Sequence, residues 1–152
     1  NGQKIIDQYD TLVNPEMPIP PFVRRLTKIT DKMVAKAPKF EEVAEKINEI
    51  TKDTIFIGHD VVSDYNFVKT AFRKTGITYV RKKLCTLSLS RKLILDEESY
   101  SLGKLCKSLG IPLEGHHRAA SDALATVKLW ELLLALDTKN IISKRIKESK
   151  RT

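Results

Sequence analysis

The stretch TIFIGHDVVSD, at residues 54–64, indicates the fold class of this chain. Its first four residues form a short apolar run that is typical of a strand buried on both faces, as in a parallel sheet. Gly58 ends the run, and the polar pair His59 and Asp60 follows where a loop would lead into a helix. We expect that helix over residues 64–74. A buried strand that leads directly into a helix predicts an α/β domain.

The residues before this stretch predict one further strand and three helices. Residues 5–13 mix β-branched, aromatic and polar side chains, which is typical of a strand. The Asn1-Gly2 pair ahead of it is typical of a tight hairpin turn, which implies a partner strand before residue 1. Helices are expected over residues 22–29, 31–35 and 40–50.

The residues after the stretch continue the alternation of strands and helices. The elements expected there are a strand over residues 78–85 and helices over residues 86–95, 102–109 and 119–136. The last helix carries few polar residues, so we expect it to be largely buried. Residues 138–152 are polar and basic, which favours a tail or a linker and leaves residues 1–137 as one domain.

The composition excludes several classes of protein. The chain has 152 residues, of which 41% are hydrophobic, enough for one domain with a core. This fraction is too high for a disordered chain, and no apolar run approaches the ~20 residues of a membrane helix. The first four residues do not resemble a signal peptide. Cys85 and Cys106 match no zinc or redox spacing, which favours reduced thiols in a cytoplasmic protein.

The net charge of +8 favours polyanionic partners, with nucleic acid first. Most of this charge lies in residues 138–152, where six lysines and arginines outnumber one glutamate for a net charge of +5. Residues 1–137 therefore carry only +3 of the +8. Within them, Arg81-Lys82-Lys83 and Arg118 are candidates for local phosphate contacts.

Two histidines lie just before expected helices whose first turns hold an aspartate. His59 precedes Asp64, and His117 precedes Asp122. The aspartates could simply stabilise the positive ends of their helices. Asp122, however, lies among alanines on an otherwise apolar helix, where an unpaired carboxylate facing the core would be costly. A cleft with a divalent cation would offset that charge, since hard cations prefer carboxylate oxygens.

Several segments match the motifs of one nuclease family in the same order. Residues 117–122, HRAASD, fit the signature H-x-A-x-x-D, and residues 56–64 are similar to the motif A-H-N-x-x-F-D. The other matching segments are residues 9–15, 19–34 and 101–106, which are similar to the V-x-P strand, the I-P…G-I-T-D-x-M-V segment and the S-L-x-x-L helix. The chain resembles the DEDDh 3′–5′ exonucleases, and in particular the epsilon (proofreading) subunit of bacterial DNA polymerase III.

This resemblance covers about residues 4–137 and implies a ribonuclease H-like fold, a mixed sheet flanked by helices. It implies a metal-dependent 3′–5′ exonuclease that releases nucleoside monophosphates from single-stranded or frayed DNA 3′ ends, in replication proofreading or repair. A DNA polymerase subunit is then the expected protein partner. The expected location is the bacterial cytoplasm, with no membrane contact.

The resemblance also implies roles for individual residues. Asp64 and Asp122 would be metal ligands in a site that holds two divalent cations, Mg²⁺ or Mn²⁺. His117 would be the general base that takes a proton from the attacking water. The residues expected to contact the substrate are His59, Asp60 and Arg118.

The sequence departs from the family pattern at several positions. Asp60 stands where the family usually has Asn, Ser63 where it prefers Phe, and Lys28 where a turn usually has Gly. His116 matches no family position, which favours a surface role. The family's first motif, D-x-E-T-T-G, supplies two of the four acidic ligands and is absent from residues 1–152.

The absent motif leaves several explanations open. The domain would lack its first strand in this chain, and a front piece of ~20–30 residues would restore it at normal strand lengths. Alternatively, the same fold serves as a non-catalytic nucleic-acid-binding or interaction module, since a fold alone does not fix a function. A third possibility is an exoribonuclease that trims RNA.

Overall fold

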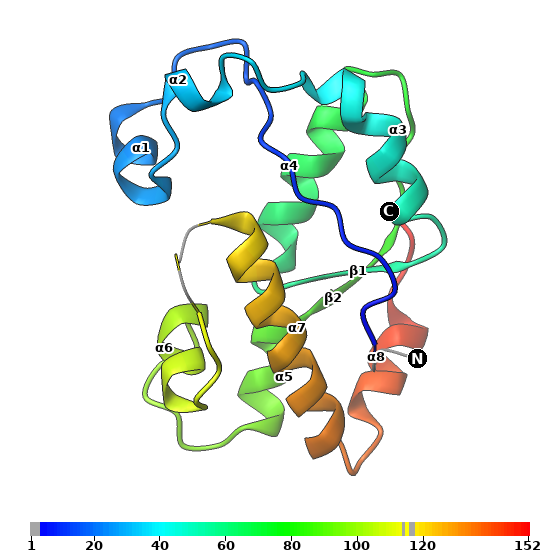
Figure 1. The fold of residues 1–152 in the computed structure, drawn as a ribbon. Coiled ribbons are helices and arrows are strands. Elements are labelled where there is room, and N and C mark those ends of the chain that lie inside the picture. The colour runs from blue at the N-terminus through cyan, green and yellow to red at the C-terminus, as the bar shows by residue number, and fades with distance from the viewer. Residues whose placement is uncertain (1–3, 114, 116–117) are drawn as a thin grey trace.

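The computed structural model describes residues 4–113, 115 and 118–152. Helices surround a single pair of strands in this part of the chain (Figure 1). The elements are α1 (Pro21–Thr27), α2 (Asp31–Val34), α3 (Phe40–Ile50), β1 (Ile55–Gly58), α4 (Val61–Arg73), β2 (Lys82–Cys85), α5 (Thr86–Leu93), α6 (Leu102–Ser108), α7 (Ala119–Leu136) and α8 (Ile141–Glu148). The predicted helices at residues 40–50 and 119–136 are confirmed from end to end.

The two strands pair in parallel, with α4 as the connection between them. Ile55 pairs with Lys82, and Gly58 pairs with Cys85. Parallel strands require such a crossover because the chain must return to the same end of the sheet before it enters the second strand. The apolar run at residues 54–57 is thus confirmed as a strand, shifted by one residue. The α/β fold class is confirmed as well.

Both faces of β1 are covered, as the apolar run predicts. Ile55 and Ile57 pack against one core cluster, whereas Phe56 between them packs against another, because successive side chains of a strand point to opposite faces. The buried members of the first cluster are Leu84, Leu89, Ile94, Leu105, Leu129, Leu133 and Ile142. The buried members of the second cluster are Ala44, Tyr65, Phe72 and Tyr79.

The prediction of a strand over residues 5–13 is wrong for the described chain. A strand requires a neighbour that pairs with its backbone N–H and C=O groups, and the described residues pair with none of this segment in a ladder. Gln8 N–H, for example, donates locally to the Asp7 carboxylate at 2.7 Å. A bridge forms only at Asn14, whose N–H donates to Pro38 O at 2.8 Å. Within the described residues, the expected mixed sheet is therefore a parallel pair.

The second strand is shorter than the predicted residues 78–85. Arg81 N–H donates to the hydroxyl of Tyr65 at 2.9 Å rather than to another strand. Tyr79 stacks on Phe72, with ring centroids 4.4 Å apart. Side-chain packing, and not a ladder of backbone hydrogen bonds, therefore holds the residues just before β2.

Residues 138–152, expected to form a solvated tail or linker, contain the packed helix α8. Ile142 on this helix belongs to the first core cluster and is 3% exposed. Beyond the helix, the Ser149 hydroxyl accepts a hydrogen bond from Lys83 N–H at 3.1 Å and donates one to Lys83 O at 2.8 Å. The segment therefore covers part of the edge of β2. Its basic residues concealed an apolar stripe on one helix face, and the division of the chain at residue 137 stays a prediction.

We expect Ile142→Ala to lower the free energy of unfolding by about 2–4 kcal/mol, because truncation of a buried isoleucine leaves a cavity. Denaturant titration of the variant measures the change. Lys144→Ala, on the exposed face of α8, is the matched control and should change stability by less than about 0.5 kcal/mol. Equal effects of the two substitutions would show that α8 does not contribute to the core.

The turn after α1 holds a lysine in a left-handed backbone conformation. Lys28 has φ 58° and ψ 18°, and its N–H donates to Arg24 O at 2.9 Å to end the helix. Glycine adopts this conformation readily, whereas a Cβ atom makes it less favourable. The left-handed conformation thus explains why the family usually has glycine at this position. Lys28 adopts the same conformation in spite of its Cβ atom.

We expect Lys28→Gly to raise the free energy of unfolding by about 0.5–1 kcal/mol, because the substitution removes the left-handed strain at an exposed position. The control is Lys46→Gly, an exposed position inside α3, which should lower stability by about 1 kcal/mol. Denaturant titration measures both. A loss of stability in Lys28→Gly would contradict the strain argument.

Candidate active site

A cleft with a volume of about 1150 Å³ lies where β1 ends and where α4 and α7 begin. It brings together four of the predicted site residues, namely His59, Asp60, Asp64 and Asp122. The first three follow β1 directly, and the fourth lies on the first turn of α7. Residues of α1, of α5 and of the segment before α6 complete the walls. The tertiary fold therefore joins two distant segments of the sequence into one acidic cleft.

Gly58, at the end of β1, makes room for the carboxylate of Asp64. A Cβ atom placed on Gly58 would lie 3.2 Å from Asp64 Oδ2 and 3.2 Å from the Cα of Val61. Both contacts are tight, and the second involves backbone that cannot easily move. The absence of a side chain therefore lets α4 begin close to the strand, with the Asp64 carboxylate against its end.

Asp60 occupies the turn between β1 and α4 in a left-handed conformation, with φ 73°. Asparagine and aspartate tolerate this conformation better than most residues, which explains why Asp is accepted where the family usually has Asn. The hydroxyl of Ser63 donates to Asp60 Oδ2 at 3.2 Å. Ser63, which stands where the family prefers Phe, therefore holds the carboxylate of Asp60, which stands where the family usually has Asn.

The carboxylates of the cleft repel one another. Burial raises the pKa of Asp64 above its ordinary value, and the nearby charges of Asp60 and Asp122 raise it further. A bound cation would relieve this repulsion, so the donor set suits a hard divalent metal. In the described ranges, however, no three His, Cys, Asp or Glu side chains are grouped closely enough to hold a metal ion. The described carboxylates alone therefore form no such group, and the roles of Asp64 and Asp122 as metal ligands stay predictions.

His59 lines the cleft, but neighbouring residues occupy both of its ring nitrogens. Nε2 lies 2.7 Å from Tyr100 O, and Nδ1 lies 3.0 Å from Thr86 Oγ1. Because a carbonyl only accepts, we assign the proton to Nε2 in the neutral ring. Burial lowers the pKa of His59, which favours that neutral form. His59 therefore joins the end of β1 to α5 and to the segment before α6, and its predicted contact with substrate stays a prediction.

Arg118 is the N-cap residue of α7 and is not among the residues that line the cleft. Its backbone carbonyl accepts from Asp122 N–H at 3.0 Å, which fixes the first turn of the helix. One guanidinium nitrogen, Nη1, is buried and has no hydrogen-bond partner. The predicted substrate contact of Arg118 stays a prediction. His117, the predicted general base, and His116 lie outside the described residues.

The basic run Arg81-Lys82-Lys83, a candidate for phosphate contacts, is engaged within the protein. Arg81 is buried, and its Nε donates to Thr51 O at 2.6 Å. Lys82 Nζ donates to Ile146 O at 3.1 Å, and Lys83 Nζ donates to the Thr152 hydroxyl. Within the described residues, these groups hold the C-terminal segment and α3 instead of pointing into the cleft.

Arg91 is the cleft residue that the sequence did not single out. It lies on α5, is exposed, and is the only lysine or arginine that lines the cleft within the described ranges. Nothing in the sequence distinguishes Arg91 from its neighbour Lys92, because both follow the same pattern of exposed helix positions. Only the packing of α5 beside His59 places Arg91 in the cleft.

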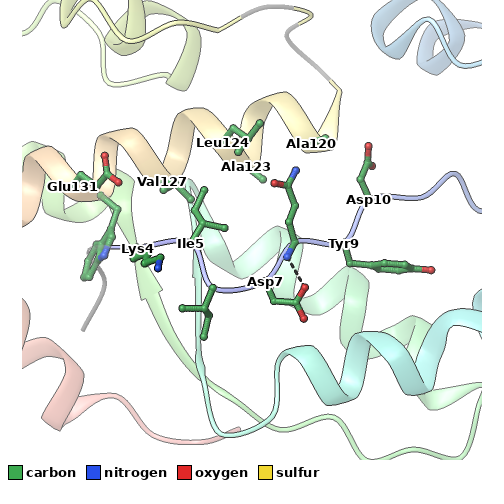
Figure 2. Close-up of a pocket in the computed structure, with 13 residues that line it drawn as sticks. Lys4, Ile5, Asp7, Tyr9, Asp10, Ala120, Ala123, Leu124, Val127 and Glu131 are labelled. Atoms are coloured by element: carbon green, nitrogen blue, oxygen red, sulfur yellow. Dashed lines mark hydrogen bonds between the residues drawn. The ribbon is translucent and has the colours of Figure 1, made fainter.

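A second, smaller hollow adjoins the cleft along α7. Figure 2 shows residues 4–10 running beside Ala120, Leu124 and Val127 of this helix. The cavity between the segment and the helix has a volume of about 380 Å³. Three side chains of α7 line both this cavity and the cleft, namely Ala123, Val127 and Trp130. The N-terminal segment therefore lies along the same helix that lines the acidic cleft.

The fold and the cleft first define a class of protein. An α/β domain whose carboxylates gather beyond the end of a parallel strand has the arrangement of a ligand or metal site of this fold class. The family model described as Exonuclease, RNase T, matches residues 1–130. The chain therefore belongs to this exonuclease family, which confirms the resemblance that the motifs carry.

Curated relatives support this assignment. The 3′-5′ exonuclease DinG of Staphylococcus epidermidis is 39% identical over 127 residues, which cover 83% of this chain and 14% of that protein. DNA polymerase III PolC-type of Caldanaerobacter subterraneus is 38% identical over 144 residues, which cover 92% of this chain and 10% of that protein. The chain thus spans a small part of the length of these relatives.

A solved structure has a similar fold. Exonuclease X in complex with 5′ overhanging duplex DNA superposes with a TM-score of 0.68 at 25% identity, covering 97% of this chain and 83% of the other. This match confirms the ribonuclease H-like α/β fold. Over the described residues, no helix is both long and apolar enough to cross a membrane.

We expect Asp64→Asn to raise the thermal midpoint of the metal-free protein at pH 7. The raised pKa means that ionisation of Asp64 costs stability, and this cost is fully present above the folded pKa. The gain should fade in acid and vanish below the ordinary aspartate value of 3.8, where both states are protonated. Midpoints followed by circular dichroism in a chelator measure it.

Glu45→Gln, an exposed position on α3, is the control for the loss of one negative charge and should shift the midpoint little at any pH. A lower midpoint for Asp64→Asn at pH 7 would show that the ionised carboxylate stabilises the metal-free fold, contrary to the repulsion described above.

Proposed function

We propose that this chain is the catalytic domain of a metal-dependent 3′–5′ exonuclease that releases nucleoside monophosphates from DNA 3′ ends. The observation that supports this most directly is the cleft in which Asp64 and Asp122 meet. The two residues come from separate motifs of the exonuclease family, and the charge of Asp122 contributes to the raised pKa of Asp64. Such repulsion is expected where carboxylates await a cation.

The proposed reaction is hydrolysis of the terminal phosphodiester. Two divalent cations, Mg²⁺ or Mn²⁺, would activate water and stabilise the leaving oxygen when bound. Asp64 and Asp122 would hold them, together with the carboxylates of the family's Asp-x-Glu motif, which residues 1–152 do not contain. Water attacks the phosphorus, and the bond to the 3′ oxygen of the preceding nucleotide breaks. His117 takes the proton of the water, and the departing 3′ oxygen gains a proton.

Single-stranded or frayed DNA ends are the substrate that we favour. The relatives include a DNA polymerase and a 3′-5′ exonuclease, and the solved relative is bound to duplex DNA. A place in replication proofreading or repair, a polymerase subunit as partner and the bacterial cytoplasm as location follow from the same proposal. Asp60 and Arg118 would contact the substrate, and His59 would hold the walls of the cleft.

A second candidate is a non-catalytic module that binds nucleic acid. The observation that favours it is that the described residues bring no three possible metal ligands together. Such a module would bind single-stranded DNA in the cleft without cleaving it. Release of mononucleotides separates the two candidates, because only the enzyme produces them.

We expect His117→Ala to lower the rate of mononucleotide release by roughly 10²–10⁴-fold, which is the usual contribution of a general base. The assay uses a 3′-labelled oligonucleotide with Mg²⁺ or Mn²⁺ and the longest form of the protein that its gene encodes. His116→Ala is the matched control and should retain the wild-type rate. Wild-type activity in His117→Ala would refute its role, and no release by the unaltered protein with either metal would refute the enzyme.

A further inference from the structure

The cleft holds charges of both signs. The carboxylates of Asp60, Asp64 and Asp122 line it, and Arg91 is the only lysine or arginine that lines it within the described residues. His59 lines the same cleft, where it joins the end of β1 to α5. A nucleic acid strand in the cleft would therefore meet both the acids and this one basic side chain.

Arg91 is available for a ligand. It is exposed on α5, lines the cleft, and makes no hydrogen bond or ion pair with the described residues. Most other basic candidates of the sequence are committed elsewhere, since Arg81 is buried and Lys82 donates to the backbone of α8. An unpaired guanidinium presents several donors in the geometry that suits phosphate oxygens.

Two residues with hydroxyl groups, Ser99 and Ser101, line the cleft together with Arg91. Ser99 and Ser101 flank Tyr100, whose carbonyl accepts from His59 Nε2 at 2.7 Å. Their Oγ atoms are 3.3 Å apart, so one hydroxyl can donate to the other and leave a further donor for a ligand. The hydrogen bond of His59 thus joins the segment that holds both serines to the end of β1, where Asp60 and Asp64 follow.

We propose that Arg91, Ser99 and Ser101 form a phosphate-binding subsite for the nucleotide that precedes the scissile bond. The inference rests on the proposed function, because it places the reacting phosphate at Asp64 and Asp122. The next phosphate of the same strand then lies at Arg91, which lines the same cleft. This subsite fixes the direction of the strand, with its 3′ end at the carboxylates. Only a substrate with at least two phosphodiester groups reaches the subsite.

The test compares a long and a short substrate. We expect Arg91→Ala to raise KM for a single-stranded oligonucleotide by about tenfold, the effect of losing one charge-assisted hydrogen bond, with little change in kcat. The p-nitrophenyl ester of thymidine 5′-monophosphate has one phosphodiester and does not reach the subsite. Its kcat and KM should stay unchanged. Arg91→Lys should recover part of the oligonucleotide affinity.

Lys92→Ala is the matched control, because Lys92 is an exposed cation on the same helix that does not line the cleft. Equal effects of Arg91→Ala and Lys92→Ala would overturn the subsite, since a general loss of charge would explain both. An equal effect of Arg91→Ala on both substrates would also overturn it, because Arg91 would then act on the scissile phosphate or on the fold.

A binding measurement separates this inference from the proposed function. Fluorescence anisotropy of a labelled single-stranded oligonucleotide in EDTA reports affinity without catalysis. Arg91→Ala should weaken binding about tenfold and reduce the slope of log Kd against log salt by about 0.7, the value for one phosphate contact on a single strand. If the unaltered protein binds in this way but hydrolyses neither substrate, the exonuclease fails and the subsite stands. Unchanged affinity in Arg91→Ala would refute the subsite.

Discussion

The short parallel ladder between β1 and β2 is the constraint on which the rest of the structure depends. Each strand has only four residues, so backbone pairing alone would not hold them together. The ladder persists because its faces are covered, with Ile57 in one core cluster and Phe56 in the other. The covered ladder fixes the ends of β1 and β2, after which α4 and α5 begin (Figure 1). The acidic cleft lies beyond the end of β1.

The residues around that end show a balance between stability and function. Gly58 has no side chain, so the Asp64 carboxylate lies against the strand, where burial and two neighbouring acids disfavour its charge. A structure selected only for stability would place a neutral or apolar group there. The hydrogen bonds of His59 with Thr86 and Tyr100, in contrast, stabilise this region, because they join three segments around the cleft.

Local patterns predicted the helices well and the strands less well. The apolar spacing of residues 40–50 and the alanine-rich start of residues 119–136 fix their helices, since helical hydrogen bonds form within the segment itself. Residues 5–13 have the composition of a strand, but a strand depends on a partner that the segment cannot supply. The many basic residues of α8 favoured a solvated tail, although Ile142 is buried. Burial depends on the whole fold, so a local pattern does not determine it.

The sequence by itself determined the α/β class and the exonuclease family and singled out the acidic candidates for the site, because motifs and short-range patterns lie along the chain. The structure brings Asp64 and Asp122 into one cleft, and their role as metal ligands stays a prediction. Only the tertiary structure decided which arginine and lysine side chains bond within the described protein and which line the cleft. Arg81 is buried by its packing against Tyr79 and its bonds to the end of α3, whereas Arg91 reaches the cleft because α5 packs beside His59. An arginine has the same chemistry at both positions. Its neighbours in the tertiary structure determine whether it stabilises the fold or remains available to bind a phosphate.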